Sequence, residues 1–215
     1  MALRNIIYKG DPLLRKRSRE IKGITNHIRE LEEDMWDTMY KANGLGLAAP
    51  QVGVLRRLVV IDVTDVGEDE GDAAENGDAG ARPEPEAGVG PMPAPGQEPK
   101  PAPEPEPKQE PEIVKYTLVN PEIIEVSDER KTSKEGCLSV PGMIGVVDRP
   151  VRVKVRAKGM DGKPFEIEGE GMLAKALLHE IDHLEGILYT DIAESVEEVK
   201  PEDGEETEGG AGTDG

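Results

Sequence analysis

The sequence has few of the features that mark secreted and membrane proteins. Only one of its 215 residues is cysteine, and a single cysteine cannot form an internal disulfide bond. No apolar run approaches the roughly 18 residues that a membrane-spanning helix needs. Residues 1–10 lack an apolar stretch followed by a small-residue cleavage site, so no secretory signal is expected. These absences predict a cytoplasmic protein that does not contact a membrane.

Basic residues are scarce relative to acidic ones, and the formal net charge is −19 at pH 7. The acidic excess lies in two segments. Residues 66–112 carry 13 acidic and 3 basic side chains, and residues 193–215 carry 9 acidic and 1 basic. The rest of the chain is close to neutral. Because DNA repels a protein of this net charge at long range, we expect no direct DNA binding.

Residues 66–112 combine this acidity with 11 of the chain's 18 prolines. Charged, proline-rich sequence favours an extended backbone and buries too little apolar surface to fold. Strand-like sequence stops at Val63 and resumes at Ile113. We therefore predict one domain over residues 1–192, a disordered insertion at 66–112 within it, and a disordered acidic tail at 193–215. The insertion is interpreted as a solvated spacer, with a docking site for a partner protein as the alternative.

The remaining sequence predicts two helices and several strands. Apolar residues at helical spacing predict one helix over residues 25–41 and a second over 170–184. Continuous or alternating apolar residues predict strands at 58–63, 117–119, 123–126, 151–157 and 164–168. The order of these elements predicts an α+β fold, with mostly antiparallel β-sheets around a central, metal-binding C-terminal helix.

That C-terminal helix contains the pattern His-Glu-X-X-His at residues 179–183. Histidines four residues apart lie on one helix face, so His179 and His183 can bind the same metal ion. Glu180 is adjacent to the first ligand and can reach a metal-bound water. The alternative is a core helix with two hydrogen-bonded histidines. Two of the chain's only three histidines lie in this pattern, which favours the metal site.

Two further segments carry candidate functional residues. A catalytic metal site normally has a third protein ligand, and the thiolate of Cys137 suits zinc or ferrous iron. The alternative for this cysteine is a small buried apolar residue. Residues 44–53 are rich in glycine and alanine, which suits a tight backbone near a ligand. Within them, the amide of Gln51 can donate to a developing oxyanion.

Together these segments resemble the three motifs of the peptide deformylase family. Residues 44–53 are similar to the first motif, 135–139 to the second and 179–183 to the third. The resemblance extends from about Ile6 to Asp191, interrupted by residues 66–112. It implies a metal-dependent amidohydrolase that removes the formyl group from the N-formyl-methionine end of nascent peptides and releases formate.

The resemblance also implies the roles of individual residues. Cys137, His179 and His183 would bind one divalent metal ion, typically Fe²⁺, for which Zn²⁺, Ni²⁺ or Co²⁺ can substitute. A metal-bound hydroxide would attack the formyl carbon, with Glu180 as general acid and base. Gln51 and the backbone N–H of Leu138 would stabilise the oxyanion. The expected substrate-binding residues are Gly44, Leu45, Gly46, Met172 and Ala176.

Some features depart from the family pattern. Lys175 stands within the last helix where an apolar pocket residue is expected, and no arginine follows the second motif before Arg149. The acidic tail would meet RNA phosphates with like charge, which argues against transient ribosome contact. A single domain favours a monomer. A zinc endopeptidase and a catalytically inactive scaffold that binds partners through its acidic segments are the alternative functions.

Overall fold

The computed structural model describes residues 2–64 and 115–199. Its two α-helices are α1 (Asn26–Lys41) and α2 (Gly171–Glu185). Its strands are β1 (Gly46–Ala48), β2 (Leu58–Asp62), β3 (Lys115–Val126), β4 (Arg130–Cys137), β5 (Val140–Pro150), β6 (Arg152–Lys158), β7 (Pro164–Glu170) and β8 (Ser195–Glu198). Short 3-10 helices cover Pro12–Arg15, Ala49–Val52 and Tyr189–Asp191.

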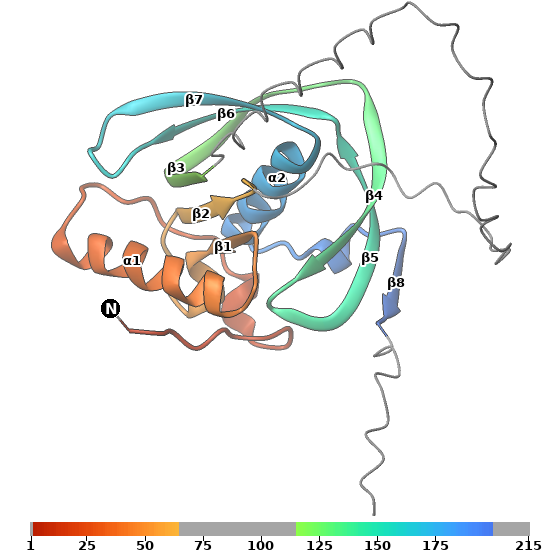
Figure 1. Ribbon diagram of the computed structural model, residues 1–215, viewed down its shortest axis with the longest axis horizontal. Coiled ribbons are helices and arrows are strands. Elements are labelled where there is room, and N and C mark those ends of the chain that lie inside the picture. The colour runs from red at the N-terminus through yellow and green to blue at the C-terminus, as the bar shows by residue number, and fades with distance from the viewer. Residues whose placement is uncertain (1, 65–114, 200–215) are drawn as a thin grey trace, which may run out of the picture.

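These strands form two antiparallel sheets beside helix α2 (Figure 1). The larger sheet has the strand order β1-β2-β3-β6-β7, and the smaller has the order β4-β5-β8. Helix α2 contacts strands of both sheets, so it occupies the centre of the fold. The predicted α+β class with antiparallel sheets around a central helix is confirmed. Among the described residues, no helix is long and apolar enough to cross a membrane.

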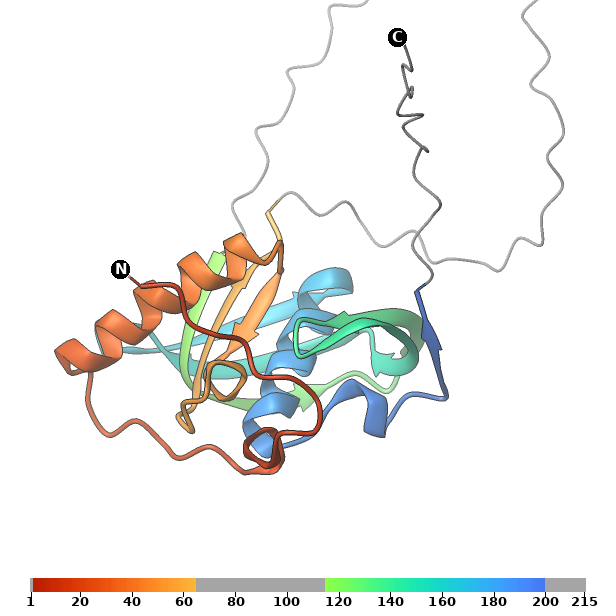
Figure 2. The ribbon, with the colours of Figure 1, turned by 90° about the horizontal axis from the view of Figure 1, so that it is seen from below.

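Strand β2 is buried on both faces, which explains its continuous apolar sequence. Val59 and Ile61 pack in the cluster that includes the apolar face of α2. Leu58 and Val60 point the other way and pack in the cluster that includes α1. Helix α1 and helix α2 therefore cover opposite faces of this part of the sheet, as Figure 2 shows from below.

Helix α1 forms where the apolar spacing predicts it. The hydroxyl of Thr25 caps its N-terminus by accepting a hydrogen bond from the backbone N–H of Ile28. The buried side chain of Asp34 accepts hydrogen bonds from the backbone N–H of Ala2 (2.7 Å) and from Nε of Arg4 (3.1 Å). These bonds hold the N-terminal segment against the helix.

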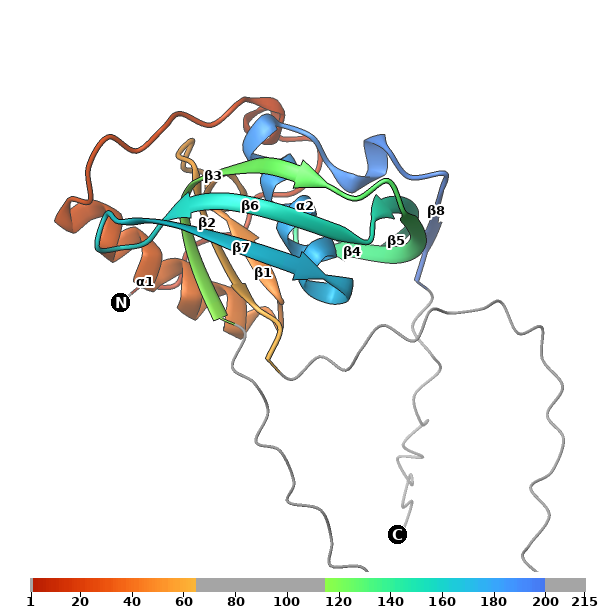
Figure 3. The ribbon, with the colours of Figure 1, turned by 90° about the horizontal axis from the view of Figure 1, so that it is seen from above.

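The strands differ from the prediction in two ways. The two predicted strands at 117–119 and 123–126 are one strand, β3, with an irregular register around Asn120, whose φ is 53°. Strands β4 and β5, visible beside α2 in Figure 3, were not predicted. The predicted disordered insertion at 66–112 lies outside the described residues.

The prediction that a disordered tail begins at residue 193 is wrong for its first residues. Ser195–Glu198 form strand β8, which pairs with β5 from Met143 to Val146. Backbone hydrogen bonds to an open sheet edge order this acidic segment, although it buries little apolar surface. The remainder of the predicted tail, residues 200–215, lies outside the described residues.

Candidate metal centre and active site

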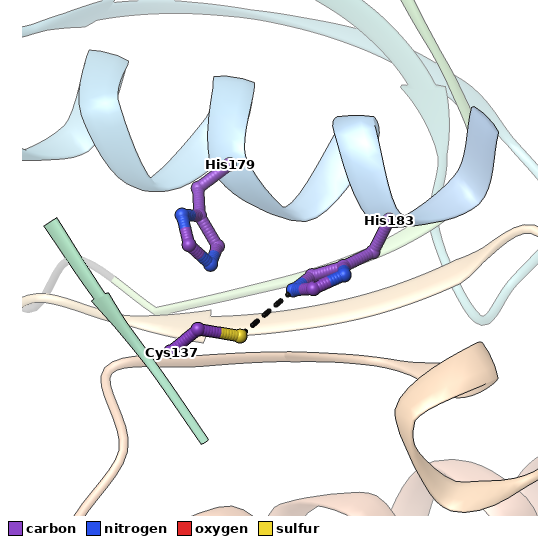
Figure 4. Close-up of side chains that lie close together, drawn as sticks. All are labelled: Cys137, His179 and His183. Carbon is purple, nitrogen blue, oxygen red and sulfur yellow. Dashed lines mark hydrogen bonds between the residues drawn. The ribbon is translucent and has the colours of Figure 1, made fainter. Parts of the chain in front are cut away.

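Helix α2 and the end of strand β4 bring three metal-ligating side chains together (Figure 4). His179 and His183 are one turn apart on α2, and Cys137 is the last residue of β4. One ligating atom from each of the three side chains lies within 4.8 Å of the ligating atoms of the other two. Sγ of Cys137 lies 3.2 Å from Nε2 of His183. Two imidazoles and a thiolate are a donor set that suits a divalent transition metal.

The protonation of His183 and the hydrogen bond of His179 also fit metal binding. Burial lowers the pKa of His183 well below its ordinary value, which favours the neutral ring that a metal needs. Nδ1 of His179 lies 2.8 Å from Oε2 of Glu135, a contact in which the ring donates and the carboxylate accepts. This bond leaves Nε2 of His179 for the metal and fixes the orientation of the ring.

A buried ion pair holds Glu135 in place. Arg149 donates to both carboxylate oxygens of Glu135, from Nε over 2.8 Å and from its second terminal nitrogen over 3.1 Å. The other terminal nitrogen of Arg149 donates to Asp182 over 2.7 Å. Burial by itself would raise the pKa of Glu135, but the bonds from His179 and Arg149 lower it to about 2. No role for Glu135, Arg149 or Asp182 is predicted from the sequence.

The side-chain amide of Gln51 is fixed with its nitrogen toward the metal ligands. Its Oε1 accepts a hydrogen bond from the backbone N–H of Ala48 (2.7 Å), which sets the orientation of the amide. Its Nε2 donates to Oγ of Ser139 (3.2 Å) and lies 3.5 Å from Sγ of Cys137. An N–H donor is therefore directed at the reaction centre that the sequence predicts.

The carboxylate of Glu180 is buried beside the ligands. Its Oε2 has no hydrogen-bond partner within the part of the chain that the structure describes, and the same holds for Nδ1 of His183. Burial raises the pKa of Glu180 to about 7. An unpaired buried carboxylate is unfavourable unless something from solution binds it, so Glu180 fits the position of a general base near a cation and a water molecule.

A cavity of about 430 Å³ adjoins this centre. Glu180, Gln51, Cys137, Leu138 and His179 contribute to its lining. The predicted substrate-binding residues also line it: Gly44, Leu45, Gly46, Met172 and Ala176. A side chain at position 44 would collide with Leu138, because a Cβ placed on Gly44 would lie 2.7 Å from Cδ1 of Leu138. The third histidine, His27, is exposed on α1 and is not part of the metal-ligating group.

The cavity is lined by metal-ligating side chains, a buried carboxylate and an oriented amide donor. These features are typical of a metal-dependent hydrolase. The model of the polypeptide deformylase family matches residues 3–199. A peptide deformylase of Lachnoclostridium phytofermentans is 44% identical over 97% of this chain and 100% of that protein. One of Thermomicrobium roseum is 39% identical over 96% of both chains. The chain belongs to the peptide deformylase family.

Solved structures agree with this assignment. The crystal structure of a peptide deformylase from Legionella pneumophila matches with a TM-score of 0.64 and 38% identity, over 89% of this chain and 86% of that one. The peptide deformylase from Thermotoga maritima matches with a TM-score of 0.64 and 29% identity, over 94% of this chain and all of that one.

Proposed function

We propose that this chain removes the formyl group from the N-formyl-methionine end of newly synthesised polypeptides, releasing formate and a free α-amine. This is hydrolysis of a linear amide. The observation that carries the proposal is the buried carboxylate of Glu180 beside the Cys137, His179 and His183 group, in a chain of the deformylase family.

Cys137, His179 and His183 would hold one divalent metal ion, which would lower the pKa of a water molecule and polarise a carbonyl oxygen. Glu180 accepts the proton of the attacking water and delivers it to the leaving amine as the bond to the formyl carbon breaks. Glu135 keeps His179 in the tautomer that presents Nε2 to the metal.

Negative charge develops on the formyl oxygen during the attack. Nε2 of Gln51 and the backbone N–H of Leu138 donate hydrogen bonds to that oxygen. The methionine side chain enters the apolar part of the cavity beside Met172, Ala176 and Leu45. The substrate backbone lies along the glycine segment at residues 44–46, which lines the cavity.

We propose Fe²⁺ as the native metal, with Zn²⁺, Ni²⁺ or Co²⁺ able to replace it. Ferrous iron and its thiolate ligand Cys137 are both open to oxidation. The iron form is therefore expected to lose activity in air faster than the zinc form. Equal rates of loss, measured in parallel with metal content, would contradict this expectation.

Formylated nascent peptides are the proposed partners. A cytoplasmic, monomeric enzyme is proposed with them, because the sequence predicts a single domain and no targeting signal. Transient ribosome contact through the acidic C-terminal segment is not expected, because that segment would meet phosphate with like charge.

The deformylases of Synechococcus elongatus and Ehrlichia chaffeensis have been solved in complex with actinonin. We propose that actinonin binds the same cavity here and competes with formylated peptide.

The test is formate release from a formyl-methionyl tripeptide by protein purified anaerobically with ferrous iron. We expect rapid release that falls at least about a hundredfold in Glu180→Gln, because the proton-transfer group is lost while metal content is kept. Cleavage of an internal peptide bond without formate would favour the zinc endopeptidase. No hydrolysis by metal-loaded protein would favour the inactive scaffold.

A further inference from the structure

The N-terminal segment makes two backbone hydrogen bonds to the segments that surround the metal-ligating group. The N–H of Ile7 donates to the backbone oxygen of Gln51 over 2.8 Å. The N–H of Lys9 donates to the backbone oxygen of Ser139 over 2.7 Å. Two donors that are two residues apart thus join two acceptors that are 88 residues apart in the sequence.

Both acceptors belong to the groups proposed to stabilise the oxyanion. Gln51 supplies its side-chain amide, and Ser139 directly follows Leu138, whose backbone N–H is the second proposed donor. Gln51 and Ser139 are only 1% and 0% exposed. Buried carbonyl oxygens are nearly always hydrogen-bonded, so removing either N–H leaves an oxygen unsatisfied or moves the segment that carries it.

Ser139 connects these backbone bonds to the reaction centre. Its Oγ accepts a hydrogen bond from Nε2 of Gln51 over 3.2 Å, and its own backbone N–H donates to Sγ of Cys137 over 3.4 Å. An amide nitrogen carries two N–H groups, so the bond to Ser139 leaves the second N–H of Gln51 for the formyl oxygen. A shift of Ser139 would therefore turn that second N–H away from its target.

The N-terminal segment is fixed on both sides of the two bonds. Before them, the N–H of Arg4 donates to Oγ1 of Thr38 on helix α1 over 3.0 Å. After them, the N–H of Ser18 donates to the backbone oxygen of Leu184 on helix α2 over 2.8 Å. No residue between 2 and 19, all of which the structure describes, lines the active-site cavity. The segment can therefore influence the reaction only through the residues that it contacts.

Resting on the proposed function, we propose that residues 7–9 are a positioning strap, which holds Gln51 and Leu138 at the spacing that the developing oxyanion requires. A shift of about 1 Å at a reacting group can cost about a hundredfold in rate, and loss of one oxyanion donor costs about 10²–10³. Removing either N–H of the strap should lower kcat about ten- to hundredfold. KM should change much less, because the donors bind the transition state more strongly than the ground state.

The test uses proline, which lacks a backbone N–H. In the metal-loaded full chain, Ile7→Pro and Lys9→Pro should each lower kcat for formate release from a formyl-methionyl tripeptide, with metal content unchanged. Tyr8→Pro is the matched control, because it lies between the two donors and removes neither of their N–H groups, so kcat should stay close to that of the parent chain. Lys9→Ala keeps the N–H and shortens only an exposed side chain, so it should lose far less than Lys9→Pro.

A double-mutant cycle separates the positioning of Gln51 from a general loss of structure. In a chain that carries Gln51→Ala, the amide is already absent, so Ile7→Pro should cost a much smaller factor in kcat than in the parent chain. A general loss of structure would cost the same factor in both. Should Ile7→Pro fail to fold, an amide-to-ester replacement at residue 7 removes the same N–H while keeping the side chain, and the same cycle applies.

Proline variants at residues 7 and 9 with the kcat of the parent chain would overturn this inference while leaving the proposed function intact. An equal loss in Tyr8→Pro, or an equal factor for Ile7→Pro with and without the Gln51 amide, would also overturn it. No formate from the metal-loaded parent chain would contradict the proposed function itself, and the inference with it.

Discussion

The backbone of Gly46 lies directly against the carboxylate of Glu180. A Cβ placed on Gly46 would come within 2.5 Å of Oε1 of Glu180, and within 2.9 Å of its Cδ and Cγ. Glycine is therefore required at position 46 by the proposed general base, and strand β1 and helix α2 position that base together. The glycine of the first motif thus helps to set the position of the side chain that is proposed as the general base.

Substituting Gly46 with alanine should displace the Glu180 carboxylate. A shift of about 1 Å at a reacting group can cost about a hundredfold in rate, so kcat is expected to fall by one to two orders of magnitude. Metal content should stay unchanged, because the ligands do not contact Gly46. Gly23→Ala is the matched control, since a Cβ there meets nothing within 4 Å. A Gly46→Ala enzyme with full kcat would contradict this account.

Substituting Arg149 with methionine should weaken both metal binding and folding. The side chains of Arg149 and Glu135 are only 9% and 2% exposed, so the variant leaves a buried carboxylate without its cation. Such a loss costs about 3–5 kcal/mol in the free energy of unfolding. Poorer orientation of His179 should lower metal affinity about 10- to 100-fold.

Urea denaturation and competition with a metal chelator measure these two effects. The control is Arg156→Met, which breaks an exposed ion pair with Glu166 and should cost less than about 1 kcal/mol. Similar stability losses in the two variants would show that the Arg149 pair has no special role.

Replacing residues 65–114 with an Asn-Gly turn should leave catalysis intact. Asp62 and Lys115 are paired on neighbouring strands, so the chain ends to be joined are already close. Shortening a flexible connection from about 50 residues to a few should stabilise the fold by about 2 kcal/mol, because less closure entropy is lost. Formate release and urea denaturation measure both outcomes. A large fall in kcat would assign these residues a part in the reaction.

Asp34 should stabilise the fold in a pH-dependent way. The backbone N–H of Ala2 lowers the pKa of Asp34, and Arg4 adds to this against the opposing effect of burial. The carboxylate therefore stabilises the protein above its unfolded-state pKa of about 4, and this stabilisation is lost as the pH falls through the lower folded-state value. Asp34→Asn should cost about 1 kcal/mol at pH 7 and almost nothing near pH 2. An equal cost at both pH values, by urea denaturation, would exclude this linkage.

The strands that the sequence predicts are those with continuous or alternating apolar residues, because burial of these side chains fixes which way the strand faces. Strand β4 could not be found in this way, because the only residue that it buries is Glu135. Its side chains from Arg130 to Lys134 are polar, and pairing with β5 holds it in place. Strand β8 is acidic and is held the same way. A register of backbone hydrogen bonds between distant segments leaves no local periodic signal in the sequence.

The residues at the metal site also differ in whether a local sequence signal predicts them. The spacing of His179 and His183 within one helix is a local signal, and it predicts the pair directly. The ion pair between Glu135 and Arg149 joins two strands and becomes recognisable only when both strands are in register. Glu135 stands two residues before the single cysteine and opens the segment that resembles the second motif, and both features could have marked it in advance.

Strand β8 has a consequence for protein engineering. A truncation after residue 192, where the composition turns acidic, would remove Val199, which lines the active-site cavity and whose N–H bonds to the backbone oxygen of Gly142. Affinity tags and fusion partners are therefore better attached beyond the acidic terminus than at this boundary. A crystallisation variant trimmed to its globular part should retain residues 193–199 as a wall of the cavity.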